Sequence, residues 1–384
     1  MPLRFRKVHG RFVPGNAVAL LRDGREAFPA MLSAIAQAQR QVLLEMYWFD
    51  SDSVGRRFAA ALGDARRRGV EVAIIYDAVG SIAADRHMFA ELEGLGAHVL
   101  EYNPVAPWRR RFRLSLGSLS RRDHRKILVV DGNVGFTGGI NLARQWAPLE
   151  EQGGGWRDDM MRIQGPAVNG LTHCFHRVWR RYQLPRLLHL HAEPAPPELA
   201  EGLVPVRILG ERYFRHRHEI ARDYASRVYA ATKSVYIANS YFVPDGSIRR
   251  ALVRAARRGV DVRVIVPAHS DVEPVKFAGR SQYQKLLEGG VRLFEWQNGM
   301  FHAKTAVIDG QWCTTGTFNF DYMSLHNNLE VNASVLDAGL SAQVERSFCD
   351  DLLGSREVLL REVLERPLTE RLLESSFYRL RKFL

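Results

Sequence analysis

The same polar motif occurs twice in this chain. In the first copy, a histidine and a lysine are followed at fixed spacing by an aspartate and a glycine-containing turn, as His124-Arg-Lys126, Asp131 and Gly138-Gly-Ile-Asn141. The second copy reads His302-Ala-Lys304, Asp309 and Gly316-Thr-Phe-Asn319. Each matched residue lies 178 positions after its counterpart (302 − 124, and equally 319 − 141). A repeat kept in register over this length indicates two similar half-domains, and repeated chemical residues indicate one site at their interface.

The order of predicted elements around the motif is also repeated. Helical spacing of apolar residues alternates with short apolar runs typical of buried strands. The first half has helices over 26–39 and 57–68 and strands over 42–49 and 70–76; the second has helices over 220–232 and 248–258 and strands over 234–243 and 260–266. We therefore predict an α/β protein of two homologous α/β/α sandwich halves, related by a pseudo-two-fold axis, with one active site at their interface.

The segment between the two copies contains the clearest break in regular structure. Three prolines fall between His189 and Gly202, where they interrupt any helix or strand. We predict an N-terminal half over 1–190, a proline-rich linker over 191–202, and a C-terminal half over 203–384 that ends in an amphipathic helix.

The repeated residues suit the chemistry of phosphoryl transfer. The motif lies on a predicted strand, so His124 and Lys126 project to one side, as do His302 and Lys304. Two lysines, together with Asn141 and Asn319, can bind the oxygens of a phosphoryl group, whose charge must be stabilised during transfer. One imidazole can attack phosphorus while the other protonates the leaving oxygen, since two neighbouring imidazoles titrate as a coupled pair.

Carboxylates near the motif are candidates for orienting the two imidazoles. Asp158 lies 34 residues after His124, and Glu330 lies 28 residues after His302; either can accept a hydrogen bond from the far nitrogen of a histidine. Asp131 and Asp309 complete the motif and are grouped with the catalytic residues, although their position at a turn favours capping and local pairing. Because the lysines supply positive charge, we predict neither a metal nor another cofactor.

The duplicated His-x-Lys-x4-Asp-x6-Gly-x-x-Asn pattern resembles that of the phospholipase D superfamily, over nearly the whole chain. Within it, the chain is most similar to short bacterial cardiolipin synthases, as shown by Trp156-Arg-Asp-Asp, Tyr241-Phe-Val-Pro244 and Asn328-Leu-Glu-Val-Asn332. The resemblance implies a phosphatidyl group carried on a histidine and then transferred from one phospholipid, typically phosphatidylglycerol, to the hydroxyl of another. By analogy with related enzymes, His124 is expected to be the nucleophile and His302 the general acid.

The chain departs from the family pattern in two respects. The hydroxyl residue that commonly follows the motif glycine is kept as Thr317 but is replaced by Gly139 in the first half. Longer cardiolipin synthases begin with transmembrane helices, whereas no apolar run in this chain approaches the roughly 20 residues that a bilayer requires. We therefore expect a cytoplasmic protein that binds peripherally to the inner face of the cell membrane.

The charge of the chain favours an anionic partner. Its 54 basic residues outnumber its 42 acidic residues, giving a net charge of +12, which suits an anionic phospholipid surface. The predicted contact is the basic and aromatic stretch formed by Trp108, Arg109, Arg110, Arg111 and Phe112. The C-terminal helix over 368–384 is the second candidate for this contact.

Three alternative functions are compatible with the same motif residues or with the same net charge. A hydrolytic phospholipase D transfers the phosphatidyl group to water, and a phosphodiesterase nuclease also suits the net charge. We consider nucleic acid an unlikely partner, because single-domain nucleases of the superfamily dimerise to build the site, whereas this chain carries both copies. For the same reason an oligomer is not required. A scaffold with a relic site is disfavoured because all eight motif residues remain.

Overall fold

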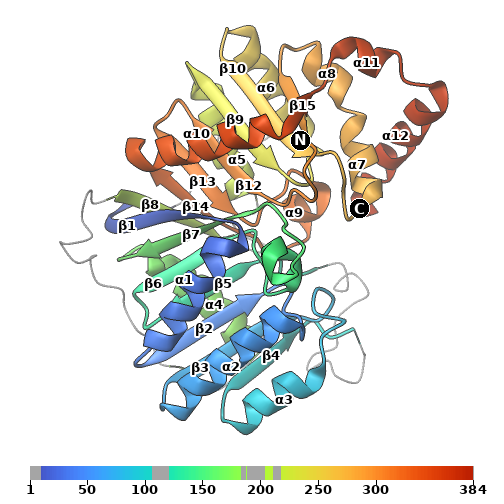
Figure 1. Ribbon diagram of the computed structural model, residues 1–384. Coiled ribbons are helices and arrows are strands. Elements are labelled where there is room, and N and C mark those ends of the chain that lie inside the picture. Colours follow the sequence, from blue (N-terminus) through green and yellow to red (C-terminus); the bar gives the residue numbers. More distant parts are fainter. Residues whose placement is uncertain (1–9, 106–120, 183–186, 188–203, 211–217, 384) are drawn as a thin grey trace.

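The computed structural model describes residues 10–105, 121–182, 187, 204–210 and 218–383. The predicted linker over 191–202 and the predicted membrane contact over 108–112 lie outside these residues. The bounds of the two halves therefore stay a prediction. Within the described residues the strands form a single 15-stranded sheet (Figure 1).

Both halves of the sheet have the same strand order. In the first half the order is β1 (Val13–Arg22), β7 (Asp159–Gln164), β6 (Val134–Gly138), β5 (Lys126–Val130), β2 (Gln41–Met46), β3 (Glu71–Asp77) and β4 (His98–Tyr102). In the second half it is β8 (Val204–Gly210), β14 (Val331–Leu336), β13 (Trp312–Gly316), β12 (Lys304–Ile308), β9 (Ser234–Asn239), β10 (Asp261–Pro267), β11 (Arg292–Trp296) and the edge strand β15 (Ser355–Glu357). The two motif strands, β5 and β12, thus occupy equivalent central positions.

Helices cover the sheet on both faces. The first half contributes α1 (Asp23–Gln37), α2 (Ser53–Arg67), α3 (Arg86–Gly94) and α4 (Val168–Arg181). The second contributes α5 (Glu219–Ala230), α6 (Gly246–Arg257), α7 (Glu273–Arg280), α8 (Tyr283–Leu287), α9 (Tyr322–His326), α10 (Ala338–Leu353), α11 (Leu360–Leu364) and α12 (Leu368–Leu380). Short 3-10 turns lie at Arg144–Trp146, Leu149–Glu151 and Arg381–Phe383. The predicted α/β fold with two α/β/α halves is confirmed.

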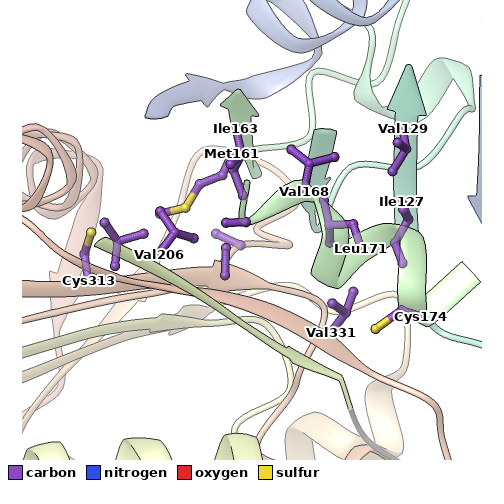
Figure 2. Packing of buried hydrophobic residues seen from close by; sticks show 14 of the residues in the cluster. Ile127, Val129, Met161, Ile163, Val168, Leu171, Cys174, Val206, Cys313 and Val331 are labelled. Atoms are coloured by element: carbon purple, nitrogen blue, oxygen red, sulfur yellow. The ribbon is translucent and has the colours of Figure 1, made fainter. Parts of the chain in front are cut away.

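The two halves meet through their first strands and through a shared core. β1 pairs antiparallel with β8, with Val13 opposite Val206 and Asn16 opposite Val204. The largest cluster of buried apolar side chains includes Met161 and Ile163 from the first half and Cys313 from the second (Figure 2). Because this core belongs to both halves, burial of its apolar surface holds the halves together and fixes how their motif strands face each other.

Each half also has a core of its own on the outer face of the sheet. In the first half, α1, α2 and α3 pack there, with Phe28 and Phe58 fully buried. In the second, α5 and α6 do so, with Tyr224 and Leu252 fully buried. The inner helices α4 and α10 complete each sandwich; α10 runs along the junction of the halves in Figure 1. The motif strands are buried on both faces, which explains their continuous apolar sequences.

The predicted C-terminal helix is present as α12 and docks on α7. The rings of Phe377 and Phe277 stack with their centroids 5.7 Å apart, and Arg280 pairs with Glu370 and Glu374. Its other side stays exposed and carries leucines, including Leu372. Among the helices of the described residues, none is long and apolar enough to cross a membrane.

Candidate active site

Two backbone bridges place each motif histidine beside an acidic residue of the opposite half. The His124 N–H donates to the carbonyl oxygen of Leu329 at 3.1 Å, and Glu330 follows Leu329 directly. In the second copy, the His302 N–H donates to the carbonyl oxygen of Arg157 at 2.7 Å, and Asp158 follows Arg157. The two bridges are equivalent, so the pseudo-symmetry extends to the site.

Both histidines bind these carboxylates through Nδ1. His124 Nδ1 lies 3.1 and 3.0 Å from the two oxygens of Glu330, and His302 Nδ1 lies 2.7 Å from Oδ2 of Asp158. The structure therefore brings the two predicted orienting residues to the two predicted catalytic histidines, in each case across the interface. Because Nδ1 is engaged in this way, Nε2 is the nitrogen that each ring presents to a substrate.

The carboxylates are held by different donors. Glu330 accepts hydrogen bonds from the hydroxyls of Thr317 and of Ser324, the latter at 2.8 Å. Asp158 accepts instead from the indole N–H of Trp146 at 2.8 Å and from its neighbour's backbone N–H. Gly139 occupies the position equivalent to Thr317, and a Cβ there would lie 2.1 Å from Oδ1 of Asp158. The missing hydroxyl thus leaves room for Asp158.

The two motif lysines are fully buried beside the histidines. Lys126 Nζ donates to the carbonyl oxygen of His124 at 2.7 Å and lies 4.9 Å from the centre of the Tyr47 ring. Lys304 Nζ donates to the carbonyl oxygen of His302 and to the hydroxyl of Ser240, the latter at 2.7 Å. Both ammonium groups are therefore fixed near the imidazoles.

The two asparagines point their amide nitrogens away from their protein partners. The Trp48 N–H donates to Oδ1 of Asn141 at 3.1 Å, and the Ser240 hydroxyl donates to Oδ1 of Asn319 at 2.9 Å. With each oxygen used in this way, the Nδ2 group is the one that can donate to a bound anion. Both asparagines line the same cavity as the histidines.

Burial shifts the titration of this cluster. It lowers the pKa of His124 below its usual value. The pKa of His302 is lowered further, because the positive charge of Lys304 adds to the effect of burial. Burial also lowers the pKa of Lys126 to about 7 and that of Lys304 to about 8. A bound phosphate anion would favour the charged form of both lysines.

The two orienting carboxylates shift in opposite directions. Burial raises the pKa of Asp158 to about 7. Burial also opposes ionisation of Glu330, but the charge of His124 and hydrogen bonds from His124 and Thr317 outweigh it and hold the pKa of Glu330 below its usual value. Near neutral pH, Glu330 is therefore an anion, whereas Asp158 exchanges a proton readily.

Both motif histidines and both motif asparagines line one cavity of about 450 Å³ between the halves, whereas the motif lysines and the orienting carboxylates are not among its described lining residues. Its walls include polar groups and a larger apolar surface, to which both halves contribute. The lining comprises Tyr47, Trp48, Val79, Gly80, Ile82, Ala83, Arg122, His124, Asn141, Trp146 and Trp156 from the first half, and Tyr241, Asp271, Val272, Val275, His302, Asn319, Asp321, Met323 and Asn328 from the second. A volume of this size suits a lipid headgroup with part of its glycerol backbone.

Asp131 and Asp309 lie at the far ends of the motif strands. The Asp131 carboxylate accepts hydrogen bonds from the backbone N–H groups of residues 39–41, and Asp309 accepts from those of residues 232–234. Each aspartate lies seven positions after its histidine, which is roughly 20 Å along an extended chain. Grouping them with the catalytic residues is thus corrected: their carboxylates anchor the chain entering β2 and β9, the local role that their turn position favours.

Several cavity residues were not predicted from the sequence. Arg122 lies two positions before His124, so period-two spacing on an extended segment could have found it. Tyr47 and Tyr241 follow the strands β2 and β9, where side chains meet the site, and their rings contact His124 and His302 respectively. No local pattern marks Trp146, which reaches Asp158 from a 3-10 turn.

The described part of the chain contains no group of three or more histidine, cysteine, aspartate or glutamate side chains that could hold a metal ion. The absence of a cofactor stays a prediction.

Comparisons with known proteins agree with this geometry. The family described as "Cardiolipin synthase, PLD-like domain" matches residues 31–153 and 224–352, which contain both motif copies. The chain is similar to a cardiolipin synthase of Geobacillus thermodenitrificans (33% identity, 94% of this chain and 71% of that protein). It is also similar to the major cardiolipin synthase of Bacillus subtilis (32% identity, 96% of this chain and 75% of that protein).

Two solved structures share the fold at low sequence identity. One is a phosphatidylserine synthase of Haemophilus influenzae, with a TM-score of 0.75, 12% identity and 97% of both chains covered. The other is a polyphosphate kinase of Porphyromonas gingivalis, with a TM-score of 0.59, 13% identity, and 94% of this chain and 52% of that one covered.

Proposed function

We propose that this chain, which belongs to the cardiolipin synthase family with its phospholipase D-like domains, makes cardiolipin through a phosphohistidine formed on His124. The enzyme is a phosphatidyltransferase that moves a phosphatidyl group from one phospholipid to the hydroxyl of another. The observation that carries the mechanism is the exchange of carboxylates across the interface, which turns Nε2 of both His124 and His302 toward one cavity.

In the first step, Nε2 of His124 attacks the phosphorus of a donor lipid, taken to be phosphatidylglycerol. The new bond joins nitrogen to phosphorus, and the bond between phosphorus and the headgroup oxygen breaks. The proton on Nε2 of His302 passes to that oxygen while Asp158 passes its own proton to Nδ1, so glycerol leaves as a neutral alcohol and His302 remains a neutral imidazole. Asn141 and Asn319 line the cavity and can donate to the phosphoryl oxygens, and the buried ammonium groups of Lys126 and Lys304 beside the histidines stabilise the negative charge that develops there.

In the second step, a second phosphatidylglycerol brings its hydroxyl to the place the leaving group vacated. Nε2 of His302 takes the hydroxyl proton, and Nδ1 returns its proton to Asp158, while the oxygen attacks phosphorus and the bond from phosphorus to His124 breaks. Cardiolipin is released, and both histidines return to their starting protonation states. Water in place of the second lipid gives hydrolysis by the same route.

The shifts of the two orienting carboxylates support this assignment of roles. An ionised Glu330 accepts the proton of His124 Nδ1, which leaves a lone pair on Nε2 for attack. Asp158, with a pKa raised to about 7, can carry a proton and donate it to Nδ1 of His302, which places the ring proton on Nε2. One ring is thus prepared as a nucleophile and the other as an acid, although both have lowered pKa values.

The experiment offers the purified protein phosphatidylglycerol, a labelled alcohol and single-stranded DNA in one assay series. We expect cardiolipin from phosphatidylglycerol alone, phosphatidyl transfer to the labelled alcohol, and no cleavage of DNA. Phosphatidic acid without cardiolipin would favour a hydrolytic phospholipase D, and cleaved DNA would favour a nuclease. Peptide mapping of a trapped adduct tests the nucleophile, since an adduct on His302 would reverse the two roles.

Peripheral attachment to the inner face of the cell membrane is part of the proposal. Besides the predicted contact at 108–112, the exposed side of α12 and the turn after it combine apolar and basic side chains, namely Leu368, Leu372, Phe383, Arg379, Arg381 and Lys382. Leu372→Ser should weaken sedimentation with phosphatidylglycerol vesicles, because an apolar contact is lost. Leu353→Ser, at the more exposed end of α10 (88% against 67%), is the matched control. Equal sedimentation of both variants and the parent would remove α12 from the contact.

A further inference from the structure

One edge of the Arg122 guanidinium has no hydrogen-bond partner among the residues that the structure describes. The side chain is only 6% exposed. Its Nη1 group contacts Oδ1 of Asp77 at 3.4 Å and the carbonyl oxygen of Asn103 at 3.2 Å. Nε and Nη2 are buried and make no hydrogen bond within the described residues. A buried donor pair left unsatisfied is costly, so its retention points to a ligand.

Arg122, which carries this unpartnered edge, is one of the residues that line the catalytic cavity. Arg122 and His124 both line it, and the extended segment that carries them is fixed by the bridge from Asp123 to Leu329 of the other half. Residues two apart on extended chain project to the same side, with Cα atoms about 6.6 Å apart. A group bound at Arg122 would therefore lie next to the phosphate at His124 and not in its place.

The guanidinium is held in a fixed orientation. Asp77 is completely buried, and its carboxylate also accepts the backbone N–H groups of Val79, Gly80 and Asp123. This network fixes the Nη1 corner and leaves Nε and Nη2, whose N–H bonds point in parallel from one edge of the guanidinium and lie in its plane. That edge has the geometry of a bidentate contact with two oxygens of a phosphate.

We propose that the Nε and Nη2 edge of Arg122 binds the phosphodiester of the second lipid, and so selects phosphatidylglycerol over water as acceptor. This inference rests on the proposed function. Cardiolipin holds two phosphodiesters joined by one glycerol, so an enzyme that forms it must hold a second phosphate one glycerol away from the reacting one. Asp271 and Asp321 line the cavity from the second half, and their carboxylates disfavour an anion there. The second phosphate is thereby directed to the first half, where Arg122 lies.

A binding experiment tests the site without turnover. In a His302→Ala background, calorimetry measures the affinity for short-chain cardiolipin, short-chain phosphatidylglycerol and inorganic phosphate. We expect cardiolipin to bind at least about tenfold more tightly than phosphatidylglycerol, the size of one charge-assisted contact. Adding Arg122→Gln should abolish this difference, because cardiolipin loses more affinity than phosphatidylglycerol does. Arg121→Gln removes the same charge from the neighbouring residue, which is not among the described residues that line the cavity, and should preserve the difference.

Two results would overturn the proposal. If Arg122→Gln weakens both lipids equally, the arginine supports the reacting phosphate or the fold and not a second one. If it weakens inorganic phosphate alone, the edge is a site for free phosphate. Should Arg122→Gln unfold, Arg122→Lys keeps the charge without the paired donors, and it should lose most of the preference for cardiolipin.

An activity series separates this proposal from the function on which it rests. Arg122→Gln in the otherwise unaltered chain should lower the ratio of transfer to phosphatidylglycerol over transfer to a neutral alcohol about tenfold or more. If the unaltered protein makes no cardiolipin but still shows the Arg122-dependent difference in binding, the proposed function is refuted and the proposed Arg122 site is retained. Cardiolipin synthesis that is indifferent to Arg122→Gln would keep the function and refute the site.

Discussion

The two halves share a strand order and a motif, but they hold their orienting carboxylates differently. In the second half, Glu330 is bound by the hydroxyls of Thr317 and Ser324 and stays ionised. In the first, Asp158 is bound by the indole of Trp146, and burial raises its pKa to about 7. Since each carboxylate serves the histidine of the opposite half, this difference gives two similar imidazoles distinct protonation patterns. In the proposed mechanism, this divergence of a few side chains around a symmetric pair of motifs makes one imidazole the acid and the other the nucleophile.

The largest expected effect comes from removing either imidazole. His124→Ala and His302→Ala should each lower turnover by roughly 10⁴-fold or more, because attack and protonation of the leaving oxygen each require one ring. Groups that act as a unit are not additive, so the double variant should be no worse than either single variant. Steady-state rates with phosphatidylglycerol measure this, and circular dichroism checks folding. A single variant that keeps a few per cent of activity contradicts one shared site.

Replacing the carboxylates by amides tests the difference between the halves directly. In Glu330→Gln the amide can donate to Nδ1 of His124, which puts the ring proton on Nε2 and removes the nucleophilic lone pair; a wrong tautomer of this kind costs about 10⁴-fold. In Asp158→Asn the amide keeps the proton of His302 on Nε2, so the loss should be only about 10- to 100-fold. Rates of adduct formation in the two variants are the measurement. Equal losses would show that the carboxylates act alike, contrary to their opposite pKa shifts.

The repeated strands, helices and motifs could be predicted from the sequence, but the hydrogen-bond partners of the two histidines could not. Apolar runs such as the one after Lys126 predict a buried strand because burial on both faces is a local property of the sequence. Glu330 and Asp158 could be named as carboxylates near the motif, since spacing alone made them candidates. That each reaches across to the other half depends on the bridges at Leu329 and Arg157, which form only once the halves pack. The indole of Trp146 follows from the same packing and has no local signature.

An intermediate effect is expected from pH. The pKa values of Lys126 and Lys304 are lowered by burial to about 7 and about 8, so the free enzyme loses these charges as pH rises through that range. We expect kcat/KM to fall as the pH rises above about 7, by about tenfold or more for each further pH unit. The acid limb should lie below 6.5, since His124 is protonated only below its lowered pKa.

The profile of kcat should differ from that of kcat/KM. A bound phosphodiester anion stabilises the charged lysines, which raises their pKa and moves the alkaline limb upward in the complex. Rates across a pH series at low and at saturating phosphatidylglycerol separate the two profiles. Asp158→Asn tests the half-to-half difference, because it removes a proton that Asp158 loses near pH 7 on the alkaline side, and it should leave the acid limb set by His124 in place. An alkaline limb at the same pH in both profiles would mean that neither lysine contacts the phosphate.

The smallest effect on activity is expected where the two halves are most alike. Asp131→Asn and Asp309→Asn each keep the side-chain shape and a residue type that tolerates the positive φ of 50° and 54° found there. Each replaces a carboxylate that accepts several backbone N–H groups by an amide whose nitrogen faces one of them. Because both sites are partly exposed, each should cost only about 1 kcal/mol of folding stability, which urea unfolding measures. Because both aspartates lie roughly 20 Å from the histidines, neither substitution should alter the rate of adduct formation. A large loss of that rate in one half alone would show that the symmetric frame itself, and not only the carboxylates attached to it, differs between the halves.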